Sequence, residues 1–246
     1  MIDGSIDYGS EPQDDTTFDD TTRINKGGLL TVGFAFQGRV DAGVTDGRLF
    51  KDIPGNHPIT VSDDGAAGDI AHFFQSMQLE YSDGGAVGEM HSFNIAGATT
   101  NPLIRGTVMH NGADTGSSST GRQLGAKSSA QTLYGVLHVV TSGATTLDID
   151  IESDDNSGFT SATTRASFTQ YVQALTDSAQ IITALKDTEV TDDWWRITST
   201  IGSSASYSYM CAVGFDELPT LGFGKLLVSN GDNFLDSASK QVYVKV

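Results

Sequence analysis

The sequence is poor in cysteine and in basic residues, and it has no long apolar run. Cys211 is the only cysteine among the 246 residues, so no disulfide can form within the chain. No stretch of about 18 consecutive apolar residues occurs, which argues against a membrane-spanning helix. Residues 1–4 have neither a basic nor an apolar character, so we expect no signal peptide. These absences predict a protein made in a reducing cytoplasm, with Cys211 as a buried structural thiol.

Basic residues are also scarce relative to acidic ones. Lys and Arg number 14 and Asp and Glu number 31, which gives a formal net charge of −17. A chain this acidic should not bind nucleic acid by neutralising phosphates. It would repel DNA, which suits a surface past which DNA must move without sticking. The alternative is that the acidity only keeps the protein soluble.

Short β-branched and aromatic runs, separated by Gly, Ser and Asp turns, make up most of the chain. The clearest run covers residues 132–141, and residues 145–152 follow after a short Ser-Gly-Ala link. In the second run Leu147, Ile149 and Ile151 alternate with acidic residues, which is the pattern of a strand with one apolar face. We therefore expect these two runs to pair as a β-hairpin.

Further strands are expected along the whole chain. Their ranges are 28–38, 58–62, 70–81, 88–95, 103–108, 165–171, 194–201, 207–215 and 241–246. Residues 70–81 also fit a helix, but the flanking strands favour a strand, whereas residues 178–185 fit either a short helix or a strand. Because no strong helical pattern occurs, the predicted fold class is all-β, an antiparallel β-sandwich or barrel.

Composition divides the chain into five expected segments. Residues 1–23 are an acidic arm with too few apolar residues for a core, ordered only by a neighbouring molecule if at all. A β domain at 24–110 and a second β domain at 131–215 flank a Gly/Ser/Thr-rich linker or loop at 111–130. Residues 216–246 form a C-terminal extension. Its last strand, with Val242, Val244 and Val246 on one face, is expected to pair with a sheet edge.

Candidate catalytic and metal-binding residues are few. No two of the five histidines lie within five residues of each other, so we expect no metal site and no cofactor. Asp148, Asp150 and Glu152 share one strand face and could serve glycoside hydrolysis, but a solvated sheet face is the favoured interpretation. Residues 154–158 resemble a calcium loop only in composition, so a turn is expected. Of Trp194 and Trp195, only one ring can point outward from a strand.

Two stretches resemble bacteriophage tail tube (major tail) proteins. Residues 16–23, Thr-Thr-Phe-Asp-Asp-Thr-Thr-Arg, followed by Gly-Gly-Leu at 27–29, resemble the T-T-F-G-D-T-T-R … G-L segment of that family, with Asp19 in place of the usual Gly. Residues 84–90, Gly-Gly-Ala-Val-Gly-Glu-Met, with Phe93 after them, resemble its G-G-x-V-G-E-[LM] … F element. The resemblance covers roughly residues 14–108, and residues 131–215 more loosely. None of these motifs is catalytic.

The resemblance implies a tail-tube β fold and a non-enzymatic virion protein. The subunits would assemble with themselves and with other tail proteins into stacked hexameric or trimeric pseudo-hexameric rings, around a channel that DNA crosses without specific binding. The second half would build the tube wall or decorate its outside. The candidate assembly arm comprises Asp14, Asp15, Phe18, Asp19, Asp20 and Arg23. Assembly in the host cytoplasm and residence in the virion tail follow. The competing interpretations are a virion decoration or receptor- or carbohydrate-binding β-sandwich and, least favoured, a hydrolase.

Overall fold

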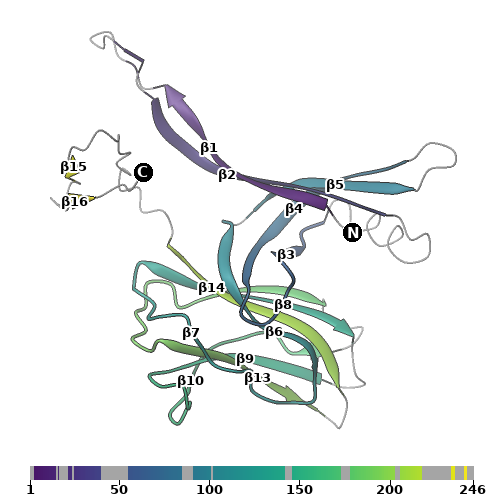
Figure 1. The fold of residues 1–246 in the computed structure, drawn as a ribbon, viewed down its shortest axis with the longest axis vertical. Coiled ribbons are helices and arrows are strands. Elements are labelled where there is room, and N and C mark those ends of the chain that lie inside the picture. The colour runs from purple at the N-terminus through teal and green to yellow at the C-terminus, as the bar shows by residue number, and fades with distance from the viewer. Residues whose placement is uncertain are drawn as a thin grey trace. The chain divides into compact units, whose positions relative to one another are not determined.

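The structure is a computed structural model that describes residues 3–14, 16, 22–23, 25–39, 55–84, 91–100, 102–141, 146–172, 178–202, 206–217, 234–235 and 241–242. Every helix or strand in these ranges is a β-strand, which confirms the all-β prediction (Figure 1). The chain forms two compact units, Met1–Asp216 and Glu217–Val246. Among the residues described, none belongs to a helix long and apolar enough to cross a membrane.

One large sheet runs through the first unit. Eight strands follow one another as hydrogen-bonded neighbours, and a ninth, β3 (Pro58–Ser62), pairs with β4. The order is β1 (Asp3–Asp14), β2 (Asn25–Arg39), β5 (Ser92–Thr99), β4 (Ile70–Gly84), β6 (Ile104–Asp114), β14 (Tyr207–Glu217), β8 (Gln131–Thr141) and β12 (Ala179–Ala184).

A second sheet packs against the β6-β14-β8 part of the first. Its strands are β10 (Thr163–Ser167), β9 (Thr146–Asp154), β13 (Trp194–Ile201) and β7 (Arg122–Gln123), with β11 (Tyr171–Val172) paired to β9. Alternate residues of β9 and β13 are buried, as expected for strands with one apolar face. They meet Leu133 and Leu137 of β8 in one core, so this part of the molecule is a β-sandwich.

The predicted hairpin of residues 132–141 and 145–152 is wrong. The two runs form β8 and β9, but these strands lie in different sheets. Both faces of β8 are buried, with Leu133 in the core shared with β9 and Val136 in a separate cluster on the opposite face. The apolar residues of β9 therefore pack across the sandwich against β8, which buries more apolar surface than pairing beside it would.

Strand β4 belongs to two parts of the large sheet. Its first residues, Ile70–Phe73, pair with β6 of the sandwich, and Ser76–Gly84 pair with β5. The register shifts between Met77 and Leu79, which marks a β-bulge. Strands β1, β2, β5 and the second half of β4 form a four-stranded part that continues from the sandwich (Figure 1). Residues 70–81, which also fitted a helix, are confirmed as a strand.

The structure differs from the expected division of the chain at residues 111–130. Strand β6 ends at Asp114 and pairs with β14, so residues on both sides of the expected linker share one sheet. The segment itself contributes β7, and Ser118 and Lys127 form bridges to Thr198 and Val190. Residues 178–185, left open between helix and strand, contain the strand β12.

More than half of the expected N-terminal arm forms regular structure, which its composition did not predict. Residues 3–14 form β1, which pairs along its length with β2. A sparse apolar pattern is sufficient because β2 supplies the packing: Ile6, opposite Phe34, lies against the small cluster that Phe34 forms with Phe74. Residues 3–14 are therefore a strand of the first unit.

Candidate assembly surface

The described residues contain no obvious reactive centre. Within them, no group of three or more His, Cys, Asp and Glu side chains is arranged to hold a metal ion. Cys211 is fully buried, and burial raises the pKa of its thiol far above the usual range. The prediction of a buried structural thiol is therefore confirmed.

Two of the three acidic side chains on β9, Asp148 and Glu152, have partners within the subunit. Glu152 forms an ion pair with Arg196 of β13 at 2.8 Å, and the ring of Phe159 lies 4.4 Å from the Arg196 guanidinium carbon. Asp148 accepts a hydrogen bond from the Gln170 amide at 2.9 Å. The ion pair and the hydrogen bond favour a structural role for Glu152 and Asp148 over a catalytic carboxylate pair, although both side chains are half-buried and not fully solvated.

Hydrogen bonds from backbone N–H groups to Asp154 stabilise the acidic turn after β9. Asp154 accepts hydrogen bonds from the backbone N–H groups of Asn156 and Ser161, at 3.2 and 2.8 Å. Burial alone would raise the pKa of Asp154, but these hydrogen bonds outweigh it and hold the pKa below its usual range. The prediction of a turn is confirmed.

The two tryptophans lie as the strand alternation predicts. Trp195 is fully buried and donates a hydrogen bond from its indole N–H to the Gly125 carbonyl at 2.9 Å. Trp194 is half-buried on the other face of β13. Only one of the two rings is therefore available to a partner.

The four-stranded part has one face with large apolar side chains. The strand registers place Ile6 and Tyr8 of β1 beside Phe34 and Val32 of β2. Phe34 is almost fully buried and its ring lies 5.2 Å from that of Phe74, measured between centroids. Tyr8 is 55% exposed, so the burial decreases toward the end of β1. This face is the one that packs onto the rest of the first unit.

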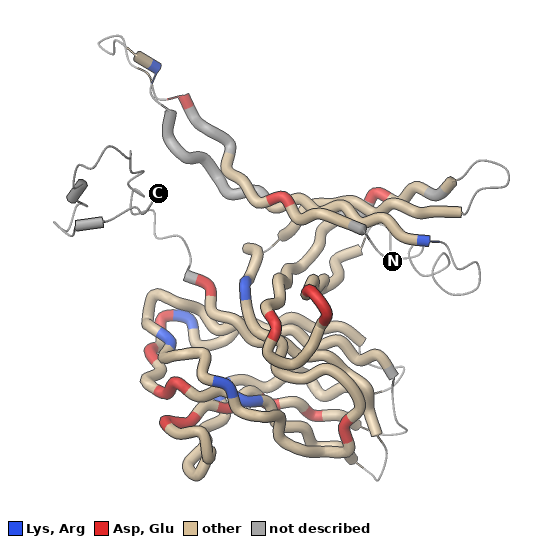
Figure 2. Tube along the Cα trace, in the orientation of Figure 1, with Lys and Arg blue, Asp and Glu red and all other residues tan. Residues whose placement is uncertain are grey.

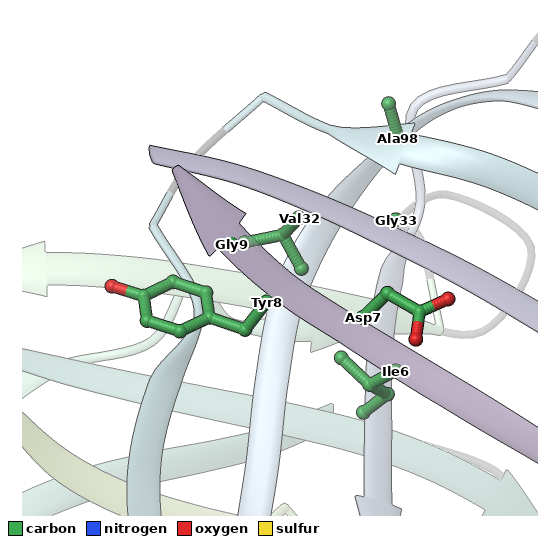
Figure 3. A pocket seen from close by; sticks show the side chains of 7 residues that line it. All are labelled: Ile6, Asp7, Tyr8, Gly9, Val32, Gly33 and Ala98. Atoms are coloured by element: carbon green, nitrogen blue, oxygen red, sulfur yellow. The ribbon is translucent and has the colours of Figure 1, made fainter. Parts of the chain in front are cut away.

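The opposite face carries small and polar side chains. By register it comprises Ser5, Asp7, Gly33, Ala35, Gln37, Asn94, Ala96 and Ala98. Because most of these side chains are short, the face has two shallow, open depressions, one at Asp7–Gly33–Ala98 and one at Ala35–Ala96. Figure 3 shows the first, with residues contributed by β1, β2 and β5. Figure 2 shows few charged positions along these strands. We call this surface the small-residue face.

The four-stranded part also has two edges. Strand β1 ends the sheet, and within the described part of the chain its one neighbouring strand is β2. From Ser76 onward β4 pairs with β5, and no other strand of the described ranges pairs with this half. Three antiparallel pairings separate β1 from β4, so the two edge strands run in opposite directions.

The structure describes two of the six predicted arm residues. Asp14 ends β1, and its carboxylate forms a 2.9 Å ion pair with Arg23 and accepts a hydrogen bond from the Thr16 backbone N–H. Hydrogen bonds from Thr16 and then Arg23 lower the pKa of Asp14. Asp15, Phe18, Asp19 and Asp20 lie outside the described residues.

Of the predicted C-terminal strand, the structure describes its first two residues. They form β16 (Gln241–Val242), in which Val242 lies opposite Phe234 of β15 (Phe234–Leu235). Val244 and Val246 lie outside the described residues. In the second unit, Gln241 and Val242 therefore pair with β15 in a short two-stranded sheet.

The edge strand β1 is the element of this surface that the sequence interpretation missed. Its signal is the short alternation of Ile6 and Tyr8 with Ser5, Asp7 and Gly9. Two apolar residues are too few to predict a strand on their own, and their meaning depends on the apolar face of β2 beside them.

No protein-family model matches the chain, and no curated protein matches it. One solved structure to which it is similar is the crystal structure of the Dit protein (gp 19.1) of SPP1, described as a paradigm of the hub adsorption apparatus in phages that infect Gram-positive bacteria. The two chains are 11% identical, the match covers 88% of this chain and 92% of that one, and the TM-score is 0.32. At this identity and TM-score the likeness carries no conclusion about the role of this chain.

Proposed function

We propose that the chain is a structural subunit of a bacteriophage tail tube, non-enzymatic, whose rings stack around a channel for DNA. The single observation that supports it most is the four-stranded part with an edge strand at each side. It agrees with the resemblance of residues 16–29 and 84–93 to tail tube proteins. The protein would assemble in the host cytoplasm and reside in the virion tail with other tail proteins.

Ring closure follows from the direction of the two edge strands. An exposed edge offers unpaired backbone groups to another strand. When β1 of one copy lies beside β4 of the next, the two strands are antiparallel, because β1 and β4 run oppositely within each copy. Repeating this head-to-tail contact closes a ring if the rotation between copies allows it. Four strands per copy therefore give a continuous antiparallel barrel with no remaining edge.

The number of copies is proposed from the same observation. A trimer that mimics a hexamer needs two four-stranded parts of this kind in each chain. The described residues contain one, and the sandwich is built differently, with two sheets packed face to face. We therefore favour six copies, with the sandwich outside the barrel.

The small-residue face would line the channel, because the opposite face packs onto the subunit's own core. By register Glu80 and Arg39 lie on the same side of the sheet as Asp7, so the described side chains on this side have a small negative excess. Such a wall repels the duplex weakly and offers no cluster of cations to its phosphates. Replacing Asp7 and Glu80 by lysine should slow DNA ejection at low salt. Unchanged ejection would contradict this assignment.

The end of the β1–β2 hairpin is a candidate for ring stacking. In the described part of the chain, strand β2 pairs with β5 from Gly33 to Arg39, and its earlier residues pair with β1. Deletion of residues 1–23 removes β1 and should leave a folded sandwich that no longer forms tubes. Full-length tubes from the truncated chain would refute the role of this segment.

Cysteine cross-linking tests the ring contact. Ser5 on β1 and Ser82 on β4 are exposed, and Cys211 is buried and should not react. A Ser5→Cys, Ser82→Cys variant treated with a thiol-specific cross-linker should give covalent oligomers up to the full ring, whereas each single variant should give at most dimers. Monomers alone, with glycan affinity and no rings in electron micrographs, would support a decoration or receptor-binding protein instead.

A further inference from the structure

We propose that His138 of β8 is a pH-sensitive link that ties β3 to the β8–β12 pair and so holds the seam between β3 and β12 closed in the curled part of the large sheet. The proposal concerns the stability of one subunit. It holds or fails independently of ring assembly.

The seam lies between two strands that each end the sheet. Among the strands that the structure describes, β12 is the last one after β8, and the pairing partner of β3 is β4. The sheet curls so that β3 and β12 nevertheless lie against each other. Among the described residues, no backbone pairing joins these two strands. The seam is therefore held by side chains rather than by a backbone ladder.

His138 points into the space that the curled sheet encloses. Alternation along β8 places it on the same face as Tyr134 and Val136, which belong to the buried cluster on that side. Thr60 of β3 lies opposite Phe73 of β4 in the register, and Phe73 belongs to the same cluster. Thr60 on β3 and His138 on β8, next to Ala179 of β12, thus face the same apolar cluster and are themselves half-buried.

A side-chain hydrogen bond joins them. The His138 Nε2 atom lies 2.8 Å from the Thr60 hydroxyl oxygen. Burial lowers the pKa of His138, and no carboxylate among the described residues offsets that effect. The titratable groups that β8 and β14 turn toward this interior are Tyr134 and Asp216, which interact with each other. His72 of β4 lies between Ala71 and Phe73 and so points to the other face.

Acidification should open the seam. A histidine whose pKa is lower in the closed than in the open state binds its proton preferentially in the open state. The closed seam is therefore most stable above the ordinary histidine pKa of about 6.5, and it loses stability as the pH falls from there through the lowered pKa. Strand β3 also carries Ile59, which packs on Phe34 and Phe74, so opening loosens the contact with the four-stranded part.

Hydrogen exchange of residues 58–62 in the full chain at pH 7.5 and pH 5.0 tests the proposal, after correction for intrinsic exchange. Protection should fall between the two values, up to about tenfold for each unit of pH in the range between the two pKa values. In His138→Gln, which keeps a neutral hydrogen-bonding side chain, the pH dependence should vanish. In the control His72→Gln it should persist.

An NMR titration of His138 in the unmodified protein supplies a second measurement that needs no variant. A pKa below the ordinary histidine value supports the proposal. A pKa at or above that value would overturn it, as would equal pH dependence in His138→Gln and the unmodified chain.

Discussion

Replacing Asp114 by alanine should lower the free energy of unfolding by about 2–4 kcal/mol. Asp114 ends β6 and is buried, and its carboxylate accepts hydrogen bonds from the hydroxyl groups of Tyr209 at 2.7 Å, Ser117 at 2.7 Å and Ser199. Tyr209 lies on β14 and Ser199 on β13, so this one carboxylate connects the two sheets of the sandwich.

The magnitude follows from the donors that the alanine would leave behind. A buried donor without an acceptor costs about 1–3 kcal/mol. Tyr209 is 1% exposed, and its hydroxyl would bear this cost in full. Ser199 retains the Ser117 carbonyl as an acceptor at 3.1 Å, and Ser117 itself is exposed to water, so both contribute less. The loss of packing around the carboxyl group accounts for the rest of the expected decrease in the free energy of unfolding.

Urea unfolding of the single variants and of the double variant Asp114→Ala, Tyr209→Phe measures the effect. The second substitution removes the orphaned hydroxyl, so the double variant should be destabilised by about 1–3 kcal/mol less than the sum of the two single variants. Asp148→Ala is the matched control: its half-buried carboxylate has a hydrogen-bond donor, Gln170, that is exposed to water, so the substitution should change stability by less than about 1 kcal/mol. Strict additivity, or a loss below 1 kcal/mol for Asp114→Ala, would refute the reasoning.

Three further outcomes are expected. Phe34→Ala should cost about 3–5 kcal/mol in urea unfolding, because the ring is buried against Phe74, whereas Gln37→Ala on the small-residue face should be nearly neutral. Burial alone would raise the pKa of Asp114, but its hydrogen bonds outweigh burial and lower it, so its contribution should be present above about pH 4 and lost as the pH falls through the lowered pKa; a pH series of unfolding midpoints checks this against Asp114→Asn. Cys211 should react with a thiol reagent only at the rate of unfolding, and rapid labelling of the native protein would contradict its burial.

Local alternation predicted where many strands lie but not which strands pair. The ranges 58–62 and 194–201 coincide with β3 and β13, because each combines alternation with clear turn residues on both sides. The prediction that β8 pairs with β9 was wrong, because alternation identifies an apolar face of a strand but does not identify the surface that covers it. That choice depends on the burial of the whole sandwich, which no short window of sequence contains.

The candidate assembly surface was less accessible to sequence reasoning. The sequence marked residues 14–23 through a family resemblance, and the structure joins Asp14 to Arg23. Whether a strand lies at an edge depends on the order of all strands in the sheet, so the edge positions of β1 and β4 could not be predicted from their own residues. The small-residue face likewise combines segments of β1, β2 and β5 that lie far apart in the sequence.

The continuity of β4 has a mechanical consequence. One covalent strand runs from the sandwich, where Ile70–Phe73 pair with β6, into the four-stranded part, where Ser76–Gly84 pair with β5. A force that pulls the two parts away from each other along this strand acts directly on the backbone of β4. It loads the β4–β6 and β4–β5 hydrogen-bond ladders in shear, so many hydrogen bonds must break together. Side-chain packing between separate domains would instead give way a contact at a time. In an optical-trap experiment that pulls on the ends of β4, the two parts should therefore rupture in one high-force event.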